Sequence, residues 1–245
     1  STYKVFLAAA GLETGLITPA SHIFCPGSFW YGNRSFRCWK KEGHGSVDLH
    51  TSLVRSCDVH DTGEGAITLD GGDRATLTPC GNAAENNDLH DYCRWSRTYR
   101  PGVLVAGVGC RVARNRIHDA PHNGILLGGN DHVIELNVLE RVCLETGDTG
   151  AFYLGRNPTE RGTVVRHNIF RDLKPSQSRP GEFNHVMAVY LDDCACGTRV
   201  EENFFMNAGW AVMIGGGRDN EVRGNVFVAC EPAISVDARA RGWAK

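Results

Sequence analysis

Asn115-Arg-Ile-His-Asp-Ala-Pro-His-Asn-Gly-Ile-Leu-Leu127 is the stretch that decides the fold. It holds two short apolar segments separated by Asp, Pro, Asn and Gly, which interrupt any helical period. Its first segment, an Asn two residues before an apolar residue, recurs along the chain at Asn87, Asn115, Asn137, Asn168, Asn203 and Asn225. Successive asparagines are 28, 22, 31, 35 and 22 residues apart. A coil of about 22 residues with occasional inserts predicts a solenoid of short strands.

A second short apolar strand lies between these units. Its copies are residues 66–69, 103–105, 125–127, 151–154, 188–191, 211–214 and 233–236. Alternate side chains of such strands point inward and stack Ile, Val and Leu from coil to coil. The repeated Asn can hydrogen-bond backbone at a corner, and stacked Asn side chains form ladders. We therefore predict an all-β fold for residues 60–245, a right-handed parallel β-helix of about six to seven coils.

Composition limits the classes of protein to which the chain can belong. The 245 residues are 42% hydrophobic and carry a formal net charge of −2, which is typical of a folded domain and argues against a nucleic-acid binder. The longest apolar run, residues 5–10, is far shorter than the roughly 20 residues of a membrane-spanning helix. The first residue is Ser1 rather than Met, so we expect a segment of a longer protein.

The ten cysteines include no C-x-x-C pair, so we predict no zinc site and no other metal site. Most of them are expected to be small buried hydrophobic residues. Cys25 and Cys38 flank an aromatic loop and could pair if the protein is exported.

The composition changes near residue 60. Three of the five lysines precede it, whereas most of the arginines and asparagines follow it. This step predicts two segments of different origin, residues 1–59 and residues 60–245. The first begins with an Ala-rich stretch that predicts a short helix ended by Gly11 or Gly15, followed by irregular chain. Ser1 and Lys4 would share one face of that helix, where the lysine could take the proton of a nucleophilic serine.

Residues 24–39, 43–50 and 52–58 resemble class B penicillin-binding proteins of the elongation type. In that family the serine of the S-x-x-K motif is acylated by the peptidoglycan stem peptide or by penicillin, its lysine is the general base, and an S-x-D motif adds a second hydroxyl. The resemblance places these roles on Ser1, Lys4, Ser56 and Asp58. The family's third motif, K-T-G or K-S-G, does not occur here. The resemblance therefore implies an incomplete D,D-transpeptidase fragment, joined to the coil near residues 56–59 as a chimera.

Residues 60–245 resemble the pectate-lyase-like family of parallel β-helix proteins, on the stretches 115–127, 128–132, 190–193 and 215–220. Members of that family act mostly on polysaccharides, as lyases, hydrolases or epimerases. The resemblance implies a polysaccharide or cell-surface glycan as the partner. Together the two resemblances imply an extracellular or periplasmic location.

Polar residues at equivalent ends of successive strands should form a stripe along one face of the coil, because neighbouring coils stack about 4.8 Å apart. Aligning the strands puts Asp148, Asp192 and Asp193 on adjacent coils. Paired carboxylates serve glycoside hydrolysis, whereas a lyase would hold Ca²⁺ with them and use an arginine such as Arg218 as base. We therefore predict Asp148, Asp192, Asp193 and Arg218 as catalytic residues of a hydrolase that needs no cofactor or of a Ca²⁺-dependent lyase.

The same stripe supplies candidates for holding a sugar chain. They are His122, Asn130, His132, Arg156 and Asp219. Each residue type is also common at ordinary solenoid corners. A third interpretation therefore stays open, in which the β-helix binds glycan or serves as a structural stalk without catalysis.

Overall fold

This computed structural model describes residues 52–173 and 185–239, together with the backbone of four strands before residue 48. Those four form two antiparallel pairs, β1 (Ile23–Cys25) with β4 (Gly45–Val47) and β2 (Ser28–Tyr31) with β3 (Arg34–Arg37). The helix predicted at the N-terminus, with Ser1 and Lys4, lies outside the described residues, as do the side chains of Cys25 and Cys38.

Contacts divide the chain into two compact units, Ser1–Ser52 and Leu53–Lys245. The second unit begins before the predicted boundary at residue 60. Ser56 and Asp58, which the transpeptidase resemblance assigned to the first segment, therefore belong to the unit that holds the coil.

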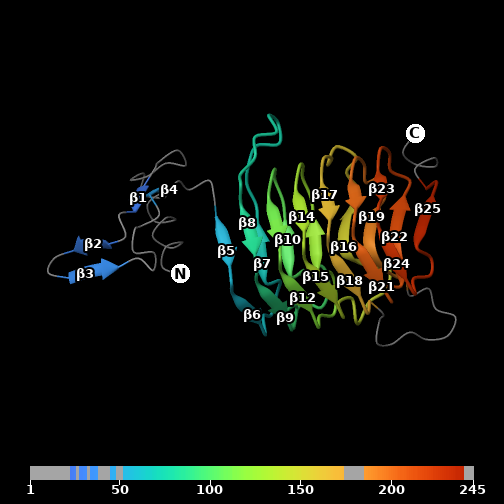
Figure 1. Cartoon of the computed structure of the whole chain (residues 1–245), viewed down its shortest axis with the longest axis horizontal. Coiled ribbons are helices and arrows are strands. Elements are labelled where there is room, and N and C mark those ends of the chain that lie inside the picture. The colour runs from blue at the N-terminus through green and yellow to red at the C-terminus, as the bar shows by residue number, and fades with distance from the viewer. Residues whose placement is uncertain are drawn as a thin grey trace. The chain divides into compact units, whose positions relative to one another are not determined.

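The second unit is a parallel β-helix of seven coils, and each coil contributes one strand to each of three seven-stranded parallel sheets (Figure 1). The first sheet comprises β5 (Leu53–Arg55), β8 (Ala83–Glu85), β11 (Arg111–Ala113), β14 (Val133–Glu135), β17 (Val164–Arg166), β20 (Arg199–Glu201) and β23 (Glu221–Arg223). The second comprises β6 (Asp58–His60), β9 (Asp88–His90), β12 (Arg116–His118), β15 (Val138–Glu140), β18 (Ile169–Arg171), β21 (Phe204–Met206) and β24 (Val226–Val228). The third comprises β7 (Ile67–Leu69), β10 (Val103–Val105), β13 (Ile125–Leu127), β16 (Thr149–Gly155), β19 (Val186–Asp192), β22 (Trp210–Gly215) and β25 (Ile234–Asp237). The predicted all-β class, parallel β-helix and coil number are confirmed.

The interior is built from columns of like side chains. Phe170, Phe205 and Phe227 stack with ring centroids 5.0 Å apart and nearly parallel planes. Leu89, Ile117 and Leu139 continue the same column toward the first coils and are fully buried. Burying such side chains stabilises the fold by roughly 1.5–3 kcal/mol each. The stacking explains why the apolar residues recur with the coil period rather than with a helical period.

The six repeated asparagines form the predicted ladder. In the five from Asn115 to Asn225, each Oδ1 accepts hydrogen bonds from the backbone N–H and from the Nδ2 of the asparagine one coil earlier, at 2.8–3.0 Å. Cys57 takes the ladder position in the first coil, where its backbone N–H donates to Asn87 Oδ1 at 3.0 Å. The residue before each ladder position has a positive φ of 53° to 64°, which turns the chain from the first sheet into the second. These residues are Ser56, Asn86, Arg114, Leu136, His167, Glu202 and Gly224.

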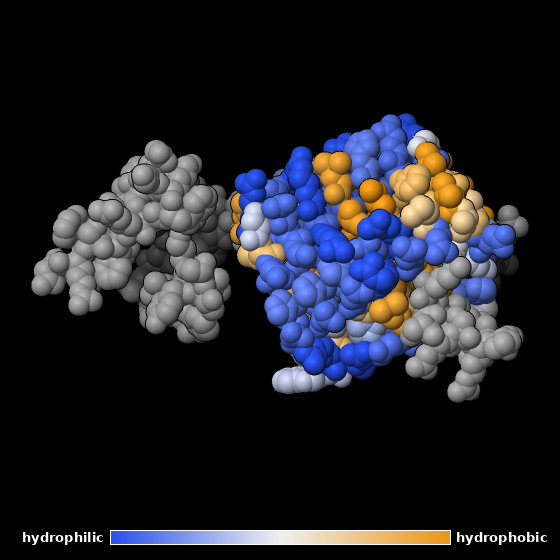
Figure 2. Space-filling model, turned by 60° about the horizontal axis from the view of Figure 1, so that its bottom comes forward, coloured by the Kyte–Doolittle hydropathy of each residue, from blue (hydrophilic) through white to orange (hydrophobic). Residues whose placement is uncertain are grey.

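The outer face of the second sheet changes character along the coil. Figure 2, which brings the lower side of Figure 1 forward, shows hydrophobic residues gathered over the later coils and hydrophilic residues over the earlier ones. Ile169, Phe204 and Val226 occupy the outward positions of neighbouring strands in the later coils and are exposed. Equivalent positions in the first coils hold Asp58 and Asp88.

Glu140, at the end of β15, is a buried carboxylate held by three arginines. Its side chain has no solvent exposure. The guanidinium of Arg116 donates to Oε1 at 2.8 and 3.0 Å, and that of Arg171 donates to Oε2 at 2.5 and 2.6 Å. Arg141 adds an ion pair at 3.2 Å. Burial raises the pKa of Glu140, but the hydrogen bonds from Arg116 and Arg171 outweigh it and hold the pKa below its usual value.

His60, His90 and His118 stack on the outer face of the second sheet, with ring centroids 5.0 and 4.9 Å apart. Nδ1 of each ring lies 2.6–2.8 Å from the carboxylate of the aspartate that follows it. Nε2 of His90 and of His118 also faces a carboxylate one coil earlier, at 3.2 and 2.8 Å. A ring between two carboxylates satisfies both only as the doubly protonated imidazolium.

This arrangement predicts a pH dependence of stability at His90. Its hydrogen bond to Asp91 raises the pKa of His90, desolvation opposes the shift, and Asp58 adds to the increase. A raised folded pKa stabilises the fold fully below the unfolded value of about 6.5, and the contribution is lost as pH rises through the folded pKa. His90→Gln should therefore lower the free energy of unfolding more at about pH 5.5 than at about pH 8.5 in urea titrations. His167→Gln is the control, because that ring is exposed and Glu202 is its one carboxylate partner among the described residues. Equal losses at both pH values for His90→Gln would refute the prediction.

Candidate functional site

The structure brings the three predicted catalytic aspartates together on the outer side of the third sheet. Asp148 immediately precedes β16, Asp192 ends β19 and Asp193 follows it. Tyr153 and Tyr190 lie at one register position of these neighbouring strands. The Tyr190 O–H donates to Asp148 Oδ1 at 3.0 Å, and the Tyr153 O–H donates to Asp192 Oδ2 at 2.8 Å.

Arg239, just beyond β25, links these groups. Its Nη1 donates to Asp192 Oδ1 at 2.8 Å, to Asp193 Oδ1 at 3.3 Å and to the Tyr190 hydroxyl at 3.4 Å. We refer to Asp148, Tyr153, Tyr190, Asp192, Asp193 and Arg239 as the carboxylate–tyrosine cluster. Arg156, predicted for substrate binding, borders it with Nε 3.5 Å from Asp193 Oδ2 and a largely exposed side chain.

The three carboxylates of the cluster differ in access to solvent. Asp192 is buried between Tyr153 and Arg239, whereas Asp193 is partly exposed and Asp148 is exposed. Burial, followed by the neighbouring Asp192 carboxylate, raises the pKa of Tyr153. Burial also raises the pKa of Tyr190. Both phenols therefore stay protonated as hydrogen-bond donors, and Asp148 and Asp193 are the carboxylates that an outside molecule can reach.

An apolar wall adjoins the cluster on the same face. Met187, Tyr190 and Met213 form a small hydrophobic group separate from the core, and Tyr153 and Trp210 pack against it. The Trp210 indole packs against the His185 ring, with centroids 4.1 Å apart and the planes tilted by 32°. Partly buried aromatic rings beside carboxylates can pack against the apolar face of a sugar while the carboxylates bind its hydroxyls.

Arg218, predicted as catalytic, does not join the cluster. The Gly197 N–H donates to the Arg218 carbonyl at 2.9 Å. Arg218 therefore lies next to the turn at Gly197 in the preceding coil, beyond the position of Asp193. Asp219, predicted for substrate binding, pairs with Arg161 in that same turn region. These two residues form a corner of the coil rather than part of the carboxylate–tyrosine cluster.

His122 and His132 are buried, and both belong to the fold. The Cys110 N–H donates to His132 Nδ1 at 3.1 Å, and His132 Nε2 lies 3.1 Å from the Gly128 carbonyl. His122 contacts Asn123 through Nδ1 and Thr149 through Nε2. Burial lowers the pKa of both rings, so both are neutral at neutral pH.

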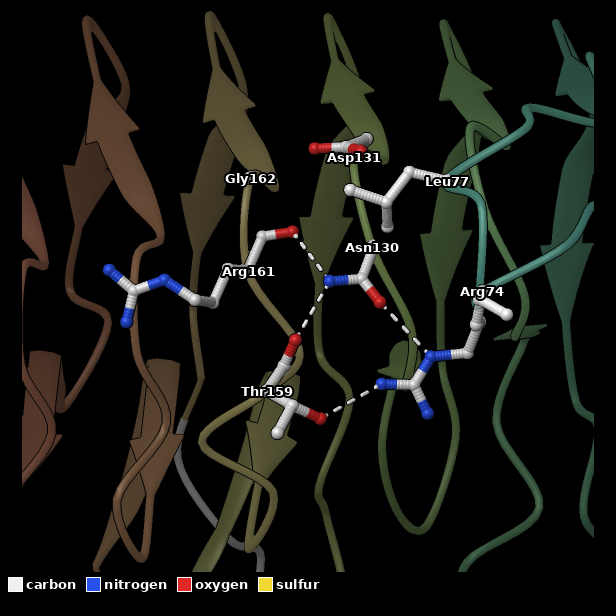
Figure 3. Close-up of a pocket in the computed structure, with 8 residues that line it drawn as sticks. Arg74, Leu77, Asn130, Asp131, Thr159, Arg161 and Gly162 are labelled. Carbon is white, nitrogen blue, oxygen red and sulfur yellow. Dashed lines mark hydrogen bonds between the residues drawn. The ribbon is translucent and has the colours of Figure 1, made fainter.

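Asn130 lines an open pocket of about 660 Å³ between the loop after β7 and the turn after β16 (Figure 3). Its Oδ1 accepts from Arg74 Nε at 3.0 Å, and its Nδ2 donates to the carbonyl of Thr159 at 2.8 Å. Arg74 also donates to the Thr159 hydroxyl at 3.2 Å. Figure 3 shows the Arg161 guanidinium pointing away from Asn130. These bonds tie two loops together, and the three predicted aspartates do not line this pocket.

Ser56 and Asp58 are occupied by contacts within the coil. Ser56 Oγ accepts from Asn86 Nδ2 at 3.0 Å, and Asp58 Oδ1 faces His90 Nε2 at 3.2 Å. Within residues 52–173 and 185–239, no group of three or more His, Cys, Asp or Glu side chains is arranged to hold a metal ion. The same part of the chain contains no helix able to cross a membrane.

Tyr153, Tyr190 and Arg239 are the members of the cluster that the sequence reasoning missed. The two tyrosines had a usable signal, because Ala-Phe-Tyr-Leu154 and Ala-Val-Tyr-Leu191 repeat a tyrosine at one strand position in adjacent coils. Arg239 follows the last strand and reaches back two coils to Asp192, and nothing in the spacing indicates that.

Comparison with known proteins identifies relatives for the N-terminal part of the chain. Residues 1–60 match the penicillin binding protein transpeptidase domain. The peptidoglycan D,D-transpeptidases MrdA of Haemophilus influenzae and of Acinetobacter baumannii are 41% identical over 63 residues and 42% identical over 62 residues. Each match covers 24% of this chain and 10% or 9% of the relative, and MrdA of Escherichia coli K12 is 37% identical over 62 residues.

The chain therefore spans about a tenth of the length of these curated relatives. No solved structure matches the chain. The pectate-lyase-like resemblance of the coil stays a prediction. What the comparisons support is the other resemblance: residues 1–60 are similar to part of a penicillin-binding-protein transpeptidase domain.

Proposed function

We propose that residues 1–60 are a peptidoglycan-transpeptidase segment and that the coil binds and hydrolyses a neutral polysaccharide at the carboxylate–tyrosine cluster. The first half of the proposal has the stronger support, because the family match covers residues 1–60 and the MrdA relatives match the N-terminal part of the chain. Ser1 and Lys4 stand there at the spacing that a serine nucleophile and its lysine base require.

The transpeptidase segment is tested with a fluorescent penicillin. We expect the 245-residue chain to stay unlabelled, because no K-T-G or K-S-G motif is present to complete the cleft. Full-length MrdA of Haemophilus influenzae serves as the positive control. A covalently labelled band that disappears in Ser1→Ala would instead assign a working nucleophile to Ser1.

The coil is proposed to act on glycan because two solvent-accessible carboxylates, Asp148 and Asp193, accompany the buried Asp192 beside the apolar wall. Glycoside hydrolysis uses one carboxyl group as acid and a second as base or nucleophile. Three carboxylates, of Asp192, Asp193 and Asp237, pair with the guanidiniums of Arg156 and Arg239. Asp148 adds a fourth carboxylate, bound to the Tyr190 hydroxyl. This acidic excess repels uronates and therefore favours a neutral glycan and hydrolysis over elimination.

Asp148→Asn and Asp193→Asn are each expected to lower the release of reducing ends from neutral polysaccharides by about 10²-fold or more. Asp219→Asn is the matched control, because Asp219 is exposed and lies outside the cluster. Release of an unsaturated, ultraviolet-absorbing sugar would indicate a lyase instead. Retention in polysaccharide affinity gels without any cleavage product would establish a binding module.

A further inference from the structure

The sulfur atoms of Cys80 and Cys110, which lie in the segments before β8 and before β11, are in contact. Their Sγ atoms lie 3.3 Å apart, without a covalent bond between them, and both side chains are buried. Cys80 ends the loop that follows β7, and Cys110 immediately precedes β11. The pair plays no part in the carboxylate–tyrosine cluster, so it requires an explanation of its own.

The backbone around the two cysteines holds them in place. The Cys80 N–H donates to the Val108 carbonyl at 3.0 Å, and the Cys110 N–H donates to His132 Nδ1 at 3.1 Å. A Cβ added at Gly109 would lie 2.4 Å from Pro79 Cβ, so glycine at this position permits the close approach of the two chain segments. The sulfurs therefore face each other from anchored backbone on both sides.

We propose that Cys80 and Cys110 are a site of oxidative modification at which a peroxide closes an intramolecular disulfide. The sulfur–sulfur distance must shorten from 3.3 Å to about 2.05 Å. Rotation of the two side chains can bring the sulfur atoms this close without a rearrangement of the backbone. The bond would enclose residues 80–110, which contain β8, β9 and β10, in one covalent ring around the second coil.

The chemistry proceeds in two balanced steps. Hydrogen peroxide oxidises the Cys80 thiol, the more exposed of the two, to a sulfenic acid and releases one water. The Cys110 sulfur then attacks the sulfenic sulfur, forms the S–S bond and expels a second water. The two thiols supply two electrons and the peroxide accepts them. Burial raises the pKa of the Cys110 thiol, so the reaction should be slow compared with that of an exposed thiolate.

The test uses the reduced 245-residue chain, treated with hydrogen peroxide, alkylated under denaturing conditions and mapped by mass spectrometry. Trypsin leaves Cys80 and Cys93 on one peptide between Arg74 and Arg94, so chymotryptic cleavage after Tyr92 is needed to separate them. We expect the Cys80 peptide to be joined to the Cys110 peptide, with a mass lower by two hydrogen atoms. The joined form should unfold at a Tm higher by about 5 °C than the reduced form.

Cys93→Ala is the matched control, since it removes a buried cysteine from the same tryptic peptide and should leave the cross-link intact. Cys80→Ser and Cys110→Ser should each abolish it. Full alkylation of both Cys80 and Cys110 after peroxide treatment of the wild-type chain would overturn the proposal. A cross-link from either cysteine to a different partner would overturn it equally, and neither result depends on the folding of a variant.

Discussion

Replacing Glu140 with glutamine is expected to lower the free energy of unfolding of the coil by about 1.5–3 kcal/mol, because the charge-assisted hydrogen bonds are lost. The Glu140 side chain is fully buried and receives hydrogen bonds from Arg116 and Arg171. An amide of the same size keeps the packing but removes the negative charge, so Arg116 and Arg171 lose their charged acceptor, whereas Arg141 keeps its ion pair with Asp119. Guanidinium-chloride denaturation at neutral pH, followed by circular dichroism, measures the change.

Glu64→Gln is the control for this experiment. Glu64 also pairs with an arginine, Arg100, but more than half of its side chain is exposed to solvent. Exposed pairs contribute about 0–1 kcal/mol, so the control should change stability by no more than that. Similar losses for the two variants would show that burial does not decide the contribution of Glu140.

Asn137→Ala should lower the free energy of unfolding by about 3 kcal/mol or more, because it breaks the asparagine ladder at its centre. The backbone N–H and the Nδ2 of Asn115 both lose their acceptor, and the Val112 carbonyl loses its donor. Asn137 is fully buried, so water does not replace these bonds without rearrangement. Urea titrations of the variant and the wild-type chain give the difference.

Cys57→Ala tests the ladder at its first position. Cys57 joins the ladder through its backbone N–H, which donates to Asn87 Oδ1 and is retained in alanine. The expected change is within about 0.5 kcal/mol. If Cys57→Ala and Asn137→Ala lowered the free energy of unfolding equally, the side-chain amides would not be what stabilises the ladder.

Much of the fold could be predicted from the sequence because each coil repeats the same local requirements. Asn115 and its equivalents recur at a buried corner, and Ile117 and its equivalents recur two residues later in the core. The boundary was harder to place. Ser56-Cys57-Asp58 matches an S-x-D motif in letters, yet Cys57 occupies the ladder position and the segment is a coil corner.

The candidate site was only partly predictable, for physical reasons that differ between residues. Asp148, Asp192 and Asp193 were found because they flank strands that stack. Arg218 was placed with them because it follows β22, but the register stacks it over Gly197. The burial of His132 could not be predicted from the sequence, because a histidine at a strand end can bond either to solvent or to a neighbouring backbone N–H. Here it accepts from the Cys110 N–H.

The asparagine ladder also gives the coil an electrical direction. Every Oδ1 in it accepts from the previous coil. From Asn87 to Asn203, each Nδ2 donates one hydrogen to the next asparagine and returns the other to a backbone carbonyl of the previous coil, as Asn115 does to Ala84. Amide dipoles aligned head to tail in a dry interior polarise one another. The two ends of the column are therefore inequivalent. At the first position Cys57 contributes only a backbone donor, whereas at the last position Asn225 accepts from Asn203 and donates back to the Val200 carbonyl. The aligned amides thus give the solenoid an electric field along its axis, in the direction from the first coil to the last.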